Sequence, residues 1–235
     1  MFHLLTTYTT ESVTPGHPDK VCDQMSDAIL DACLAQDPKS RVAVETFGSH
    51  GTLMIGGEVT TKAVVDYAAI AKKGYEDIGY TEPLDILTRV VTQSPDIAMG
   101  VDTDGAGDQG IMYGYATNET EEMLPKGVVL AHALARKLEQ LRTSGTLPYL
   151  RPDGKTQVTM KNGVVITGLT STQHAEDVEQ ETIRKDLIEH LFTPVLGDLT
   201  NIEILVNPTG RFVQGGFEAD AGLTGRKIMV DTYGG

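Results

Sequence analysis

Two parts of the chain repeat one order of expected elements, strand–strand–helix–strand. In the first part, apolar stretches at 41–47 and 52–59 read as strands, and a helix at 62–78 and a short strand near 87–92 follow. The second part repeats this order with strands near 156–160 and 163–170, a helix at 175–192 and a strand at 202–206. Segments of this kind bury their apolar faces by packing helices on a sheet. The sequence therefore predicts an α+β fold with helices on one face of each sheet.

A further helix is expected before each repeat, at 18–35 and near 127–142. Pro18 suits the first helical position, because its missing N–H would have no partner there. The only cysteines, Cys22 and Cys33, lie in the first helix, eleven residues apart. That spacing separates them by about 16 Å, too far for a disulfide. We expect two buried thiols.

Composition excludes several classes of protein. A net charge of −14 argues against a nucleic-acid binder, which needs a positive surface. It leaves room for an anionic small ligand, which needs only a local group of cations or bridging metal ions. No apolar run approaches the roughly 20 residues that span a bilayer, and the N-terminus lacks the basic flank of a signal peptide. We expect a cytoplasmic protein without a membrane partner.

Three glycine-rich segments carry the residues best suited to chemistry. They are Gly16-His-Pro-Asp-Lys20, Gly105-Ala-Gly-Asp-Gln-Gly110 within an expected loop over 94–110, and Gly222-Leu-Thr-Gly-Arg-Lys227. Glycine lets the backbone approach a ligand closely. A histidine, carboxylates and cations on such backbone are suited to holding a polyphosphate with its metal and to breaking a bond beside it.

Each residue also has a simpler interpretation. His17 precedes a helix start, where an anion would meet backbone N–H groups and an imidazole, but it could also be an exposed histidine. Asp19 could bind magnesium or only favour the helix dipole. Asp108 could face a positive reacting centre or only hydrogen-bond within a turn.

The remaining candidates follow turns. Asp153 and Lys155 would stand at the start of a strand, or form a solvated hairpin corner. Arg226 and Lys227 would clamp phosphate from the edge of a strand at 228–230, or be exposed strand-end charges.

Arg211 and Phe212 could meet a nucleotide, although a core phenylalanine is the simpler interpretation of Phe212. No P-loop, dinucleotide-binding glycine motif or zinc-type cysteine and histidine spacing is present. A nucleotide would therefore be held in another way.

The chain resembles S-adenosylmethionine synthetase (methionine adenosyltransferase). The matching segments span the chain in the family's order: Glu11-Ser12 with Gly16-His-Pro-Asp-Lys20; Gly105-Ala-Gly-Asp-Gln-Gly110 with Tyr113-Gly-Tyr-Ala-Thr-Asn-Glu119; Gly145-Thr-Leu-Pro148 with Leu150-Arg-Pro-Asp153; Ser171-Thr-Gln-His174; Asn207-Pro-Thr-Gly-Arg-Phe212; and Gly222-Leu-Thr-Gly-Arg-Lys227 with Asp231-Thr-Tyr-Gly-Gly235.

The resemblance implies a two-step reaction. The methionine sulfur attacks C5′ of ATP and expels tripolyphosphate, which is then hydrolysed to pyrophosphate and phosphate. The implied catalytic residues are His17, which would assist the departing oxygen, Lys155, and Asp108, which would lie near the developing sulfonium.

The implied binding residues fall into three groups. The ATP-binding residues would be His17, Asp153, Lys155, Arg211, Phe212, Asp220, Arg226 and Lys227. The methionine-binding residues would be Glu58, Gln93 and Asp220. Asp19 would bind Mg²⁺ and Glu45 would bind K⁺.

The family's fold has three similar α+β domains related by pseudo-threefold symmetry. We expect an N-terminal domain at 1–97, a gating loop at 98–107 that is shorter than is usual, a central domain at 108–216, and the start of a C-terminal domain at 217–235. The family's chain normally continues past Tyr-Gly-Gly, so the resemblance implies that this sequence holds only the start of the C-terminal domain. The partner would be a second copy, or a chain that supplies the missing domain. Without that partner, the alternative is a non-catalytic nucleotide-binding or regulatory subunit.

Overall fold

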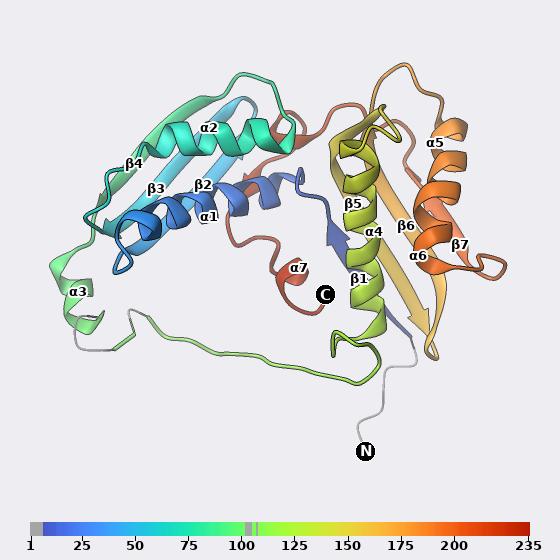
Figure 1. Cartoon of the computed structure of the whole chain (residues 1–235), viewed down its shortest axis with the longest axis horizontal. Coiled ribbons are helices and arrows are strands. Elements are labelled where there is room, and N and C mark those ends of the chain that lie inside the picture. Colours follow the sequence, from blue (N-terminus) through green and yellow to red (C-terminus); the bar gives the residue numbers. More distant parts are fainter. Residues whose placement is uncertain (1–6, 102–104, 107) are drawn as a thin grey trace.

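The computed structural model describes residues 7–101, 105–106 and 108–235, and it contains two sheets side by side, each with its own helices (Figure 1). The sheet drawn on the left in Figure 1 has the order β4-β3-β2-β8, and the one on the right has the order β1-β5-β6-β7. The expected α+β class is confirmed. Within the described ranges, no helix combines the length and the apolar character needed to cross a bilayer.

The first sheet carries helices α1 and α2. Its strands are β2 (Arg41–Ser49), β3 (Thr52–Thr60), β4 (Asp85–Thr92) and the two-residue β8 (Gly222–Leu223). Helix α1 (Pro18–Gln36) begins at the expected proline, and the His17 side chain accepts a hydrogen bond from the Asp19 N–H as its N-cap. Helix α2 (Tyr67–Ile78) starts later than expected, because the Asp66 side chain caps it by accepting from the Ala69 N–H.

The second sheet carries helices α4 and α5. Its strands are β1 (Thr7–Val13), β5 (Leu150–Lys161), β6 (Val164–His174) and β7 (Glu203–Val206), and its helices are α4 (Lys126–Thr143), α5 (Gln180–Leu187), the π-helical η1 (Ile188–Phe192) and α6 (Thr193–Leu196). Asn162 and Gly163 turn β5 into β6 with φ angles of 50° and 79°, as a two-residue hairpin requires.

Several sequence expectations need correction. Part of the expected 94–110 loop is helix α3 (Pro95–Val101), and residues 102–104 and 107 of the expected gating loop lie outside the described residues. The expected strand at 228–230 is a helical turn, α7 (Ile228–Asp231). A short 3₁₀ turn, η2 (Gly216–Glu218), precedes β8.

Two strands, β1 and β8, pair with strands that are far from them in the sequence. β1 pairs antiparallel with β5, from Thr7 opposite Lys161 to Val13 opposite Lys155. β8 pairs antiparallel with the end of β2, with Leu223 opposite Phe47. The segment before α1 and the segment after η2 therefore meet between the two sheets. The division into domains at 1–97 and 108–216 stays a prediction.

Each sheet has its own apolar core. One centres on α1 and α2 against β2 and β3, and the other on α4, α5 and η1 against β5 and β6. Cys22 and Cys33 are free and buried in α1, as expected. Burial raises the pKa of the Cys22 thiol to about 12, so this thiol stays protonated and unreactive at neutral pH.

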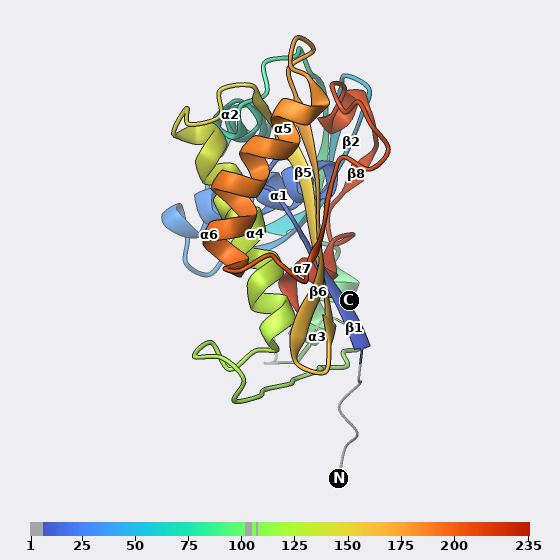
Figure 2. The ribbon, with the colours of Figure 1, turned by 90° about the vertical axis from the view of Figure 1, so that its right-hand side faces the viewer.

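All the large helices cover one side of the two sheets, and the opposite side is open (Figure 2). On the first sheet this open side carries exposed apolar side chains: Phe47, Met54, Leu87, Val91 and Leu223. A sheet face of this kind is rarely left to water in a stable protein.

Candidate active site

The site begins at the start of α1, where the two sheets meet. We call this place the seam. The His17 ring is only 2% exposed, so the interpretation of a surface histidine is wrong. The preceding Gly16 lies against β5, and a Cβ there would come within 2.4 Å of Pro152 atoms. Only glycine fits so close to Pro152. This close approach places the start of α1, which packs on the first sheet, against β5 of the second sheet.

Asp19 is the centre of a charge cluster drawn from distant parts of the chain. Its carboxylate lies 3.3 Å from the Lys227 ammonium and 3.5 Å from the Arg226 guanidinium, and it accepts a hydrogen bond from the Leu223 N–H at 3.0 Å. Asp19 is 1% exposed, and Lys227 is also largely buried. The carboxylate is therefore held in place by the β8 turn as well as by the helix dipole.

The His17 imidazole is neutral at physiological pH. Burial, followed by the positive charge of Lys227, Lys155 and Arg226, lowers its pKa to about 3. Nδ1 accepts the Asp19 N–H at 3.2 Å, so the single proton of the neutral ring is on Nε2. The ring can therefore donate one hydrogen bond without carrying a charge.

Asp153 supplies a second buried carboxylate, from β5. It is 4% exposed, so it does not form a solvated corner. Its Oδ2 accepts the Gly216 N–H at 2.9 Å, while its Oδ1 has no hydrogen-bond partner within the described ranges. Burial raises the pKa of Asp153 to about 6, and the Gly216 hydrogen bond and the Lys155 charge only partly oppose this shift. An unpartnered buried carboxylate oxygen of this kind is suited to a polar ligand.

The raised pKa gives a stability prediction for Asp153→Asn. Between about pH 4 and 6 the folded chain binds a proton that the unfolded chain has lost, so wild-type stability falls as pH rises through this window. The shift from 3.8 to about 6 corresponds to about 3 kcal/mol at neutral pH. We expect Asp153→Asn to be more stable than the wild type by an amount of this order at pH 7, and about equal to it near pH 4. Urea unfolding at both pH values measures this, and a difference independent of pH would contradict it.

Several predicted residues lie apart from this cluster. The Arg211 guanidinium is ion-paired with Glu176, and the N–H of the half-buried Phe212 donates to His174 Nε2 at 3.1 Å. Asp108 is exposed, and its carboxylate accepts the N–H of its neighbour Gln109, as in the turn interpretation.

Of the residues predicted for methionine and potassium, Glu45 and Glu58 lie in the first sheet and Gln93 directly follows its strand β4. The Gln93 amide nitrogen lies 3.5 Å from Glu58 Oε1, while its oxygen accepts from Arg41 at 3.1 and 3.2 Å. Glu45 is exposed on β2. These side chains project toward the open side of the sheet.

Lys155 and Asp220 are exposed, but their charges act on both His17 and Asp153. The structure therefore brings together seven of the predicted residues around the seam: His17, Asp19, Asp153, Lys155, Asp220, Arg226 and Lys227.

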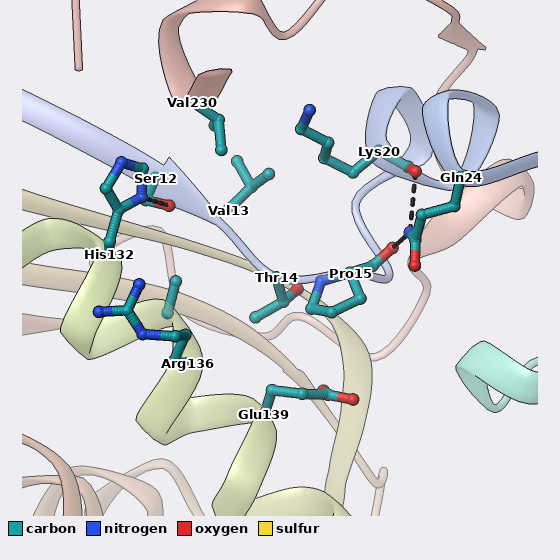
Figure 3. A pocket seen from close by; sticks show the side chains of 11 residues that line it. Ser12, Val13, Thr14, Pro15, Lys20, Gln24, His132, Arg136, Glu139 and Val230 are labelled. Atoms are coloured by element: carbon teal, nitrogen blue, oxygen red, sulfur yellow. Dashed lines mark hydrogen bonds between the residues drawn. The ribbon is translucent and has the colours of Figure 1, made fainter. Parts of the chain in front are cut away.

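A pocket of about 370 Å³ lies elsewhere, between α1, α4 and the end of β1 (Figure 3). Its wall includes His132, whose Nδ1 lies 2.9 Å from the Ser12 hydroxyl, together with Arg136 and Lys20. The sequence analysis did not single out His132 and Arg136, although their i, i+4 spacing places them on one helix face. None of the predicted site residues lines this pocket, so the candidate site is the seam and not the pocket.

Comparison with known proteins identifies the family of the chain. The sequence model of the S-adenosylmethionine synthetase N-terminal domain matches residues 5–96, and that of the central domain matches residues 103–212. The chain belongs to the S-adenosylmethionine synthetase family. Among its relatives, the S-adenosylmethionine synthase of Clostridium tetani is 50% identical over 260 residues, and that of Desulforudis audaxviator is 52% identical over 258 residues.

These family members are longer than the chain described here. The matches cover 97% of this chain but 66% of the C. tetani protein and 65% of the D. audaxviator protein. The S-adenosylmethionine synthase 1 of Rhodospirillum rubrum, 51% identical, is covered to 64%. The chain thus spans about two thirds of these relatives.

Proposed function

We propose that the chain takes part in the synthesis of S-adenosylmethionine from ATP and methionine. The observation that supports this most is the seam itself, where a buried neutral imidazole, two buried carboxylates and three cations meet. Such a group can bind a triphosphate and a divalent cation at one end and assist the departure of an oxygen at the other. The names of the relatives give the same activity.

In the proposed reaction the methionine sulfur forms a bond to C5′ of ATP. The C5′–O bond breaks, and its electron pair leaves with tripolyphosphate. The Nε2–H of His17 would donate a hydrogen bond to that oxygen as negative charge develops, and Lys155, Arg226 and Lys227 would hold the phosphates. These interactions strengthen in the transition state, which is the requirement for catalysis. Water then cleaves tripolyphosphate into pyrophosphate and phosphate.

The other predicted contacts complete this proposal. Arg211, Phe212, Asp153 and Asp220 would contact the nucleotide; Glu58, Gln93 and Asp220 would hold methionine. Asp108 would lie near the sulfonium, where its negative charge would stabilise the positive sulfur.

Asp19 fits the proposed magnesium site. Its buried Oδ2 accepts no hydrogen bond among the described residues, although the Lys227 ammonium lies 3.3 Å away, and magnesium in phosphate sites takes only one or two carboxylates beside substrate oxygens. The bound ion would neutralise charge on the phosphates. Lys227 and Arg226 lie beside Asp19 and balance its charge.

Potassium fits this chain less well. In the described ranges, no group of three or more histidine, cysteine or acidic side chains could hold a metal ion, and Glu45 offers a single exposed carboxylate. We derive no step from potassium. A site at Glu45 would need further oxygen ligands beside this carboxylate.

A second copy is also our proposal for the open face of the first sheet. Phe47, Met54 and Leu223 form an apolar surface there, on the same side as Glu45 and Glu58. Packing two such faces together would bury the apolar side chains and enclose the proposed methionine site. The remaining third of the relatives' length would come from the same or another polypeptide.

The decisive experiment incubates the purified chain with ATP, methionine, Mg²⁺ and K⁺, with and without the C-terminal third of a relative. Mass spectrometry then follows S-adenosylmethionine, and phosphate analysis follows pyrophosphate and phosphate. Product in either mixture supports the proposal. Tight binding of a non-hydrolysable ATP analogue without turnover in any mixture would instead indicate a nucleotide-binding subunit.

Met54→Lys tests the proposed self-association. A charge at the centre of the buried face should raise the dimer dissociation constant roughly 30-fold, the effect of about 2 kcal/mol. Val164→Lys, at an exposed valine in the other sheet, is the matched control. Sedimentation measures both variants, and equal behaviour would rule out this face as the interface.

A further inference from the structure

Tyr80 follows α2 directly, and its ring belongs to a stack of three. The chain turns at Gly79, which has a φ of 111°, and Tyr80 then enters the core with 4% exposure. Its ring stacks on Tyr75 with centroids 4.9 Å apart, and Tyr75 stacks on Phe217 at 5.7 Å. The stack fixes the ring, because any other rotamer would break these contacts.

The Tyr80 hydroxyl holds one end of a single peptide unit, the one that joins Gly16 to His17. It donates to the Gly16 carbonyl oxygen at 2.6 Å, while the N–H of the same unit, on His17, donates to the Thr14 carbonyl at 3.1 Å. Both polar groups of this peptide are therefore paired. Burial raises the pKa of Tyr80 well above its usual value, so the hydroxyl remains a donor.

The same ring also borders the second carboxylate of the site. A Cβ on Gly216 would lie 2.6–2.7 Å from Tyr80 ring and hydroxyl atoms, so the ring packs directly on that backbone. The Gly216 N–H is the group that donates to Asp153. Tyr80 thus touches the backbone that orients His17 and the backbone that orients Asp153.

We propose that Tyr80 is a positioning residue of the active site: its hydroxyl fixes the Gly16–His17 peptide and so directs the His17 Nε2–H toward the substrate. With the peptide fixed, the His17 side chain starts from a defined Cα and meets the Asp19 N–H with Nδ1. Without the hydroxyl, the peptide is held only by its N–H bond to Thr14, and the imidazole loses its single orientation. The proposal rests on the function proposed above.

Tyr80→Phe removes only the hydroxyl, and Tyr75→Phe is a matched control. Tyr75 lies in the same stack, is equally buried, and in the part of the chain that the structure describes its hydroxyl makes no hydrogen bond. The first measurement is the ¹⁵N spectrum of the His17 ring in the metal-free chain. The wild type and Tyr75→Phe should show one tautomer with the proton on Nε2, and Tyr80→Phe should show a mixture.

The second measurement is turnover in the mixture that forms S-adenosylmethionine. Tyr80→Phe should lower kcat about tenfold, equivalent to about 1.4 kcal/mol, and change KM for ATP less than about twofold. In a His17→Asn background, Tyr80→Phe should lower kcat no further, because the tyrosine acts on the reaction through His17. An equal loss in that background would indicate a general structural role and overturn the proposal.

The two measurements separate the possible failures. If the wild type forms no product in any mixture, the proposed function fails, and the ring spectrum still decides whether Tyr80 orients His17. If Tyr80→Phe matches Tyr75→Phe in the spectrum, the positioning role is refuted whatever the activity.

Discussion

His17→Asn should lower kcat for S-adenosylmethionine formation by about 10²- to 10³-fold, the usual effect of removing one donor to a developing oxyanion. Asparagine is a good N-cap and can still accept the Asp19 N–H, so α1 should begin as before. Its shorter side chain does not reach the place of Nε2–H. Steady-state kinetics measure the effect, with KM for ATP changing little because the phosphates keep their cations.

His132→Asn is the control for this change. His132 is also partly buried, burial lowers its pKa too, and it lies in the pocket between α1 and α4. It should keep nearly full activity. Equal losses in the two variants would remove His17 from the mechanism. Because the pKa of His17 is about 3, the wild-type rate should also show no step from this group between about pH 5 and 8.

Asp19→Asn should destabilise the fold by about 3 kcal/mol and abolish magnesium-dependent activity. The change keeps an oxygen for the Leu223 N–H but leaves the largely buried Lys227 ammonium without its carboxylate. Breaking one side of a buried ion pair costs more than the pair itself contributes. Urea unfolding measures the loss of stability. Arg226 is half exposed and contributes little to it.

Two further variants make this prediction specific. Asp19→Asn combined with Lys227→Met removes both charges and should recover much of the stability, while activity stays absent. Asp23→Asn removes only one of the two carboxylates beside Lys20 and should cost about 1 kcal/mol or less of stability, because the Lys20 ammonium keeps Asp231 as a partner. If Asp19→Asn lowers the free energy of unfolding no more than Asp23→Asn does, the Asp19–Lys227 pair does not organise the site.

The open face of the first sheet links fold and function. The helices cover only one side of each sheet (Figure 2), and Glu45 and Glu58, predicted for potassium and methionine, lie on the uncovered side of the first sheet. The second sheet shows polar groups such as Thr9, Thr159 and Lys161 on its outer face. Apart from Val164 at the start of β6, the exposed large apolar side chains of the described strands gather on the first sheet, which favours one specific partner surface over non-specific association.

Local signals in the sequence determined the regular elements well. Helix α1 begins at Pro18 and α4 spans almost its expected range, because apolar spacing and caps act within a few residues. The β5–β6 hairpin follows from Asn162-Gly163 for the same reason. The motifs and the family resemblance also predicted the residues that meet in the seam.

The contacts between distant segments of the chain were decided only by the tertiary structure. The pairing of β1 with β5, the two-residue β8 beside β2, and the approach of Leu223 and Lys227 to Asp19 join residues far apart in the sequence. No local preference encodes such contacts, since a strand as short as β8 is stable only on an existing sheet edge. The same packing buries His17 and Asp153 and brings the Tyr80 hydroxyl to the Gly16 carbonyl. Burial and charge shift the pKa of a group only after the folded chain has brought the groups together.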